Sequence, residues 1–158
     1  MTGNPEVVAC LSDCLKAELT AINQYFLHSK MCENWGYLRL AKDLFKESVE
    51  EMKHAEKLVE RILFLDGYPN MTDLFPIKIG AGVQDQLEND LATETDSVAR
   101  LNRGISVAVD AGDTGSRELF ESILTGEEEH IDWLEAQLHL IEEVGLDKYL
   151  AQQIHKDG

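Results

Sequence analysis

Two copies of a Glu-x-x-His motif are the residues of this chain best suited to chemistry. Glu51 and His54 form the first copy, and Glu127 and His130 form the second copy 76 positions later. Residues three apart on an α-helix lie on one face about a turn apart, so each pair could offer a carboxylate and an imidazole to one metal ion. A single pair of this kind arises by chance in charged helices, whereas a repeat is a more specific signal.

The same offset of 76 relates further positions of the chain. Glu18 is followed by Glu94 at this interval, and Gly36 is followed by Gly112. The chain therefore reads as two helical hairpins of similar plan, each with one isolated Glu and one Glu-x-x-His motif. For any one of these residues an exposed surface role is the better interpretation, but for all six at one offset we favour a shared site. The candidate ligands are Glu18, Glu51, His54, Glu94, Glu127 and His130.

Four long helices are expected to position these ligands. Apolar residues recur at alternating steps of three and four, the pattern of a helix with one buried face. One glutamate interrupts the apolar seam of each helix. Asn4 is the expected N-cap of the first helix, with Pro5 at its first position. The expected helices span residues 4–34, 38–65, 83–109 and 116–144.

The connections predict the topology. Short turns around Gly36 and at residues 111–116 indicate two antiparallel hairpins. Residues 66–82, a 17-residue segment, are long enough to cross the full length of a bundle, so the third helix should run parallel to the second. Residues 147–155 predict a short fifth helix. The whole chain, residues 1–158, is expected to form one all-α domain with a bundle over residues 4–144.

Composition narrows the class of partner. With 14 Lys and Arg against 30 Asp and Glu, the formal charge of −16 argues against nucleic acid and anionic membranes and favours cations. Acidic helices can also serve solubility alone, so charge by itself does not decide. The chain has no apolar run of membrane-spanning length and no signal-peptide pattern at its start, and we expect a cytoplasmic protein. Cys10, Cys14 and Cys32 lack zinc-like spacing and are expected to be reduced thiols.

Four carboxylates at mid-height of one bundle need a counter-charge. The carboxylates would repel one another and lose their hydration, at a cost of roughly several kcal/mol for each unpaired ion. Two divalent cations would balance the four negative charges. Oxygen-rich ligands with one imidazole per metal suit iron or manganese, whereas structural zinc favours thiolates.

The chain resembles the bacterioferritin family over its whole length. The stretches AINQYFLHSKM, ESVEEMKHAEKLVERILFLDGYPN and EEEHIDWLEAQLHLIEEVGLDKYL carry the resemblance. It implies a ferritin-like four-helix bundle, assembled from two-fold dimers into a hollow cage of 24 subunits. Each subunit would be a ferroxidase that oxidises Fe(II) with O2 or H2O2 at a di-iron centre and stores the ferric product inside. It also implies a ferredoxin-type reductant for iron release.

The resemblance assigns roles to individual residues. The six candidate ligands match the family's di-iron ligands, with Glu51 and Glu127 as the expected bridges. Tyr25 matches a tyrosine beside the centre, although a role as a core aromatic is equally open. Met52 is turned about 100° around the helix from Glu51 and should face a neighbouring helix or subunit. It matches the family's haem ligand, so two copies would bind one haem b across a two-fold interface.

Position 46 departs from the family pattern. Some members carry a histidine and an aspartate where this chain has Lys46 and Glu50, and that pair holds an extra iron on the cavity wall. A lysine ammonium is cationic and has no free lone pair, so we expect it to pair with Glu50 on the next turn and the wall site to be lost. Oxidised iron should then leave the centre for the cavity through His130, although Glu47 and Glu50 could still bind iron.

Two other functions use the same bundle. A di-iron oxygenase or di-manganese catalase would need a substrate pocket or a partner for which this short chain leaves little room. A carrier that binds metal or haem without turnover is the non-enzymatic alternative. The rate of Fe(II) oxidation distinguishes a ferroxidase from a carrier.

Overall fold

Four long helices and one short helix make up the computed structural model, which describes residues 1–155. No β-strand occurs in that range, so the expected all-α class is confirmed. The helix bounds lie within two residues of the expected ones, apart from the last helix. The helices are α1 (Pro5–Asn34), α2 (Leu38–Phe64), α3 (Val83–Asp110), α4 (Thr114–Val144) and α5 (Leu146–Ala151).

The fifth helix is shorter than the sequence predicts, because α5 ends at Ala151 and does not continue to His155. The backbone N–H groups of Gln152 and Gln153 bond three residues back, which tightens the last turn. The carbonyl of Gln153 then accepts a hydrogen bond of 2.9 Å from the backbone N–H of Arg39 in the first turn of α2. The end of α5 therefore satisfies a backbone donor in the first turn of α2 that has no partner within its own helix.

The hairpins form as the turn residues predict. The Asn4 side chain accepts hydrogen bonds from the backbone N–H groups of Glu6 and Val7, at 2.8 and 3.3 Å, and so caps α1. Gly36 and Gly112 occupy equivalent places after α1 and α3, with φ of 90° and 70°. Such angles favour glycine, which explains why both hairpins turn at a glycine.

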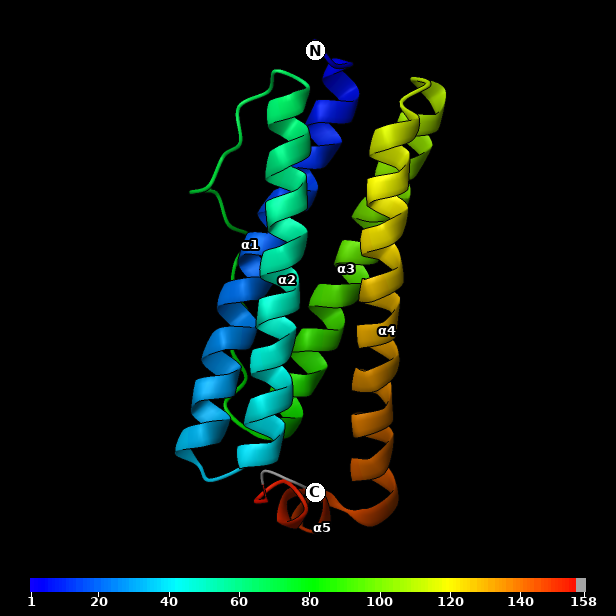
Figure 1. Cartoon of the computed structure of the whole chain (residues 1–158). Helices are drawn as coiled ribbons and strands as arrows, with labels where there is room; N and C mark the ends of the chain where they lie inside the picture. Colours follow the sequence, from blue (N-terminus) through cyan, green and yellow to red (C-terminus); the bar gives the residue numbers. More distant parts are fainter. Residues whose placement is uncertain (156–158) are drawn as a thin grey trace.

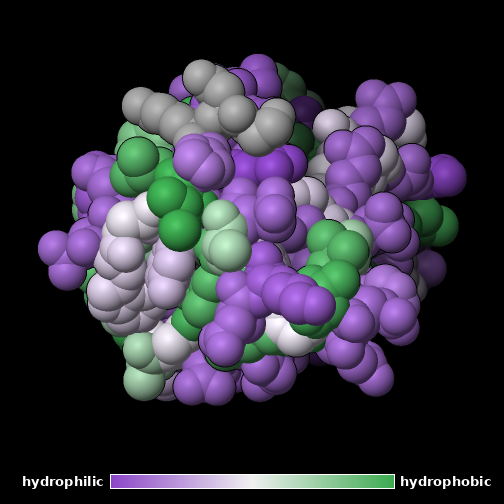
Figure 2. Space-filling model, turned by 90° about the horizontal axis from the view of Figure 1, so that it is seen from below, coloured by the Kyte–Doolittle hydropathy of each residue, from purple (hydrophilic) through white to green (hydrophobic). Residues whose placement is uncertain are grey.

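The two hairpins lie side by side in a bundle (Figure 1), in which α1 packs against α2 and α3, and α4 packs against α3 and α2. The connection over residues 65–82 descends the length of the bundle, so that α3 runs parallel to α2, as expected. Within residues 1–155, no helix has the combination of length and apolar character that crossing a membrane requires. The end that carries α5 is largely hydrophilic, with separate hydrophobic patches (Figure 2).

A polar stripe on α1 holds the connection in place. Thr20, Gln24 and His28 lie one turn apart, and each side chain accepts a hydrogen bond from a backbone N–H of residues 75–80, at 2.9, 3.0 and 3.1 Å. Asp90 on α3 accepts from the other side, 2.8 Å from Gln24 and 2.9 Å from His28 Nδ1. This buried network, which joins α1, α3 and the connection, does not follow from the sequence pattern.

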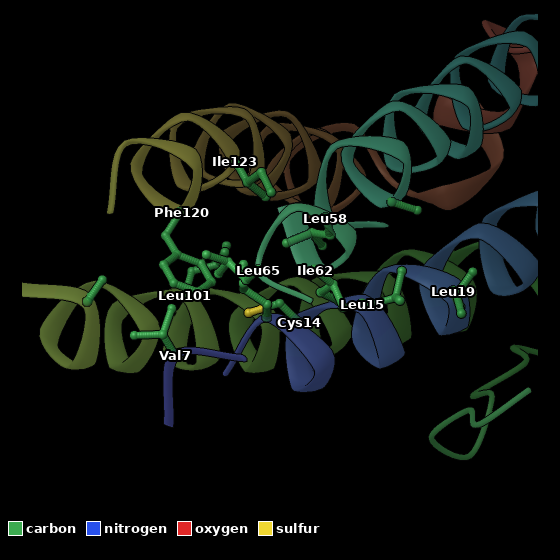
Figure 3. Packing of buried hydrophobic residues seen from close by; sticks show 13 residues of the cluster. Val7, Cys14, Leu15, Leu19, Leu58, Ile62, Leu65, Leu101, Phe120 and Ile123 are labelled. Carbon is green, nitrogen blue, oxygen red and sulfur yellow. The ribbon is translucent and has the colours of Figure 1, made fainter. Parts of the chain in front are cut away.

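The hydrophobic core is divided into two clusters, one towards each end of the bundle. In the first, side chains of all four long helices point towards one another (Figure 3). Along α2, α3 and α4, the glutamate that interrupts the apolar seam falls between a stretch that contributes to the first cluster and one that contributes to the second. On α1 the first cluster extends just past Glu18 to Leu19, and Cys32 belongs to the second. The core therefore leaves a polar layer at mid-height. The first cluster includes Val7, Leu15, Leu58, Ile62, Leu101 and Phe120, and the second includes Leu40, Leu44, Leu87, Leu134 and Ile141.

Gly104 provides a test of the packing in the first cluster. A Cβ at this position of α3 would lie 2.8 Å from Cζ of the buried Phe120 ring. Alanine normally stabilises a helix relative to glycine by ~0.5–1 kcal/mol, but overpacking costs ~1–3 kcal/mol. Gly104→Ala should therefore lower the free energy of unfolding by ~1–2 kcal/mol in urea denaturation of the metal-free protein.

The steric control for this prediction is Gly82→Ala, because nothing lies within 4 Å of a Cβ built there and only the N-cap preference of α3 changes. Adding Phe120→Leu to the Gly104→Ala variant should recover part of the loss by freeing space for the new methyl group. A Gly104→Ala variant as stable as the parent protein would contradict this account of the core.

Candidate metal centre

The polar layer at mid-height contains all six predicted ligands. One carboxylate comes from each long helix, and each is at most 2% exposed. The two histidines lie one turn beyond the carboxylates of α2 and α4. The six residues that the structure brings together are Glu18, Glu51, His54, Glu94, Glu127 and His130.

The first group of ligand atoms surrounds His54. Its Nδ1 atom lies 2.9 Å from Glu127 Oε1. The same atom lies 3.6 Å from Glu18 Oε2 and 3.7 Å from Glu51 Oε2. Ligand atoms of these four residues lie within 4.8 Å of one another, so one metal ion could contact them all.

The second group surrounds His130 and differs from the expected set. The Nδ1 atom of His130 lies 3.3 Å from Glu94 Oε1 and 3.6 Å from Glu47 Oε2. The compact set here is Glu47, Glu51 and His130, again within 4.8 Å. Glu47 lies one turn before Glu51 on α2, but nothing in the sequence placed it beside a histidine of α4.

Several atoms of the candidate ligands lack hydrogen-bond partners. Buried polar atoms in proteins are nearly always hydrogen-bonded, and an unpaired one costs about 1–3 kcal/mol, or more when charged. Here several buried oxygen and nitrogen atoms of the six residues have no hydrogen-bond partner, among them both carboxylate oxygens of Glu127 and both ring nitrogens of His130. These unpaired atoms all belong to good ligands for iron or manganese, so a pair of divalent ions fits the site.

Burial and mutual repulsion control the protons of this site. Loss of hydration raises the pKa values of Glu18 and Glu51 well above their usual range, and neighbouring carboxylates raise them further. Burial alone would lower the pKa of His54, but the neighbouring Glu127 and Glu51 carboxylates raise that pKa to about 10. Burial lowers the pKa of His130. Metal-free protein thus retains protons on the first group, while His130 is neutral.

Tyr25 lies directly beside the second group. Its hydroxyl donates a hydrogen bond to Glu94 Oε1, and its ring meets the His130 ring edge-on at a centroid distance of 5.2 Å. The side chain is fully buried. Both alternatives from the sequence therefore describe it, because it is a core aromatic that also contacts two candidate ligands.

Met52 points away from the metal centre. Its side chain is 56% exposed, whereas the neighbouring Glu51 is buried. Phe45, Val49 and Met52 form an exposed apolar stripe on α2, and Phe26 of α1 extends it, 6.4 Å from Phe45 between ring centroids. A soft thioether on an apolar surface fits a haem group, which offers an iron ion and two hydrophobic faces.

The pairing expected between Lys46 and Glu50 is wrong. Glu50 Oε1 is instead bonded to Lys53 Nζ at 3.1 Å, on the opposite side along α2. Both lysines are within reach of Glu50 on a helix surface, and the side-chain conformation decides between them. Cys10, Cys14 and Cys32 are free thiols, as the sequence predicted.

The chain matches a known family model and several known proteins over nearly its whole length. A family model described as a ferritin-like domain matches residues 8–144. The chain is 47% identical over 156 residues to a bacterioferritin of Mycobacterium tuberculosis, covering 99% of this chain and 98% of the relative. It is also 47% identical to a bacterioferritin of Streptomyces coelicolor, covering 99% and 93%, and 44% identical to one of Brucella melitensis, covering 94% and 92%.

The raised pKa values predict how stability depends on pH. Glu18, Glu51 and His54 bind protons more tightly in the folded protein, so their contribution is complete below the unfolded pKa and is lost as pH rises through the folded one. For His54 the window runs from about 6.5 to about 10. The Tm of metal-free protein should fall across it, by about 2–4 °C for each kcal/mol lost.

Thermal melts over this pH range test the prediction. Protein loaded with Co(II) should show a smaller fall, because the metal holds the ligands deprotonated in the folded state. His54→Gln should flatten the metal-free profile, whereas replacement of the exposed His139 by Gln should leave it unchanged. A metal-free Tm that stays constant or rises from about pH 6.5 to about pH 10 would refute the raised pKa of His54.

Proposed function

Since the chain belongs to the bacterioferritin family, we propose that it stores iron by oxidising Fe(II) to Fe(III) at its mid-bundle centre. The observation that carries the proposal is the layer of six ligands, each with at least one buried oxygen or nitrogen atom that lacks a hydrogen-bond partner. Fe(II) is the substrate, and O2 or H2O2 is the oxidant. Two Fe(II) ions supply two electrons, which reduce H2O2 to two hydroxide ions or O2 to peroxide.

The ligands act by charge and position. Four carboxylates balance two Fe(II) ions, so a filled centre is neutral and no longer suffers the repulsion that raises the pKa values of Glu18 and Glu51. Glu51 is common to both groups of ligand atoms, which suits a bridge between the two ions. Glu127 is proposed as the second bridge. Tyr25 orients Glu94 through its hydroxyl hydrogen bond.

Assembly and haem binding complete the proposal. The apolar stripe around Met52 would be covered by the same stripe of a second copy, with one haem b held between the two Met52 side chains. Twelve such two-fold dimers would form a cage of 24 subunits whose cavity receives the ferric product. A cytoplasmic location and iron release by a ferredoxin-type reductant follow the family pattern.

Removing a bridging carboxylate tests the oxidation centre. Glu51→Ala and Glu127→Ala should each slow the fast phase of Fe(II) oxidation, followed by stopped-flow absorbance, by more than about tenfold, since even groups behind metal ligands contribute that much. The matched controls are Glu56→Ala and Glu128→Ala, which alter exposed glutamates on the same two helices. Fast oxidation in both bridge variants would exclude this site, and Fe(II) binding without oxidation in the parent protein would indicate a carrier.

Met52→Leu tests the haem site. Leucine keeps the volume and apolar character of methionine but removes the sulfur, so the variant should lose its haem absorbance while Fe(II) oxidation continues. Assembly should also persist, with elution in size-exclusion chromatography at about 427 kDa, the mass of 24 chains of 17.8 kDa. Normal haem content in the variant would rule out Met52 as the ligand.

A further inference from the structure

The two histidines of the metal centre have different surroundings. The ring of His130 is in contact with two aromatic side chains, because Tyr25 meets it edge-on at 5.2 Å between ring centroids and Trp133 stacks on it at 6.0 Å. The His130 side chain is 1% exposed, whereas 18% of the His54 side chain is exposed. The two halves of the centre therefore hold their imidazoles by different means.

The ring of His54 packs against the backbone of α4 at Gly126. A Cβ built on Gly126 would lie 3.2 Å from both Cε1 and Nε2 of this ring, closer than ordinary van der Waals contact. Gly126 directly precedes Glu127, whose Oε1 atom lies 2.9 Å from the other ring nitrogen, Nδ1. The ring is thus placed between the α4 backbone on one side and the carboxylates of the first group on the other.

The helical backbone does not itself require a glycine at position 126. Gly126 lies inside α4 and is not among the glycines with a positive φ. A glycine in the interior of a helix destabilises that helix relative to alanine. The requirement at this position is therefore for space, and the side chain that occupies the space is the candidate ligand His54.

We propose that Gly126 is a positioning residue of the metal centre, because its lack of a side chain lets the His54 ring lie against α4 with Nδ1 facing the three carboxylates of the first group. The inference rests on the proposed function and concerns its binding step. A methyl group at position 126 would displace the ring by a few tenths of an ångström. Ligand distances in metal sites are fixed to within about 0.2 Å, so this displacement weakens the bond between His54 and its ion.

Gly126→Ala tests the proposal through the binding of Co(II), which requires no oxidation. The parent protein should bind two Co(II) per subunit, and the variant should bind the ion at His54 about tenfold more weakly, as when a group that orients a metal ligand is lost. The affinity for the ion at His130 should not change. Crystals soaked at a series of Co(II) concentrations distinguish the two positions by anomalous scattering. Ser122→Ala is the matched control, because it also introduces alanine into α4 but at an exposed position.

A double-mutant cycle shows whether Gly126 acts through His54. In a His54→Ala background there is no ring to displace, so Gly126→Ala should change the remaining affinity for Co(II) by less than about twofold. The inference is overturned if Gly126→Ala leaves the affinity at His54 unchanged, if it weakens both positions equally, or if its effect is as large without the imidazole. A parent protein that binds two Co(II) but oxidises no Fe(II) would refute the ferroxidase function, while the Co(II) affinities would still decide the role of Gly126.

Discussion

Four buried carboxylates at mid-height of the bundle are the constraint on which the rest of the structure depends. Each lies where the helical pattern requires an apolar side chain, and each is at most 2% exposed. The hydrophobic clusters above and below supply the stability that this layer does not. Protons relieve the repulsion in the metal-free protein. Bound cations would take their place, and the free energy of metal binding would then add to the free energy of folding.

The connection between the hairpins shares in positioning the centre. Thr20, Gln24 and His28 hold residues 75–80 on the outside of α1, and Asp90 joins that network from α3. Asp90 lies one turn before Glu94, so the same hydrogen bonds that fix the connection also fix the register of α3 against α1. The long crossover is therefore more than a spacer that permits parallel helices.

Periodicity and the lengths of the connections were sufficient to predict the helices, their directions and the residues that meet at mid-height. Spacing along the chain determines which face of a helix a residue occupies, and the lengths of the connections determine how the helices run. The Lys53–Glu50 pair, the contact between Glu47 and His130, and the early end of α5 were not predicted. These depend on side-chain conformations and on neighbours from other helices, which spacing on one helix does not specify.

The duplicated plan of the hairpins explains why the candidate ligands come in two similar sets. Equivalent positions supply the ligands, but the residues around them have diverged, with Leu101 at the position that corresponds to Tyr25 and Ile123 at the one that corresponds to Glu47. In the proposed function, oxidation would add two positive charges to a set of four carboxylates that two Fe(II) ions leave neutral. A site that binds both Fe(II) ions well would therefore hold the oxidised product with excess positive charge, which favours its release.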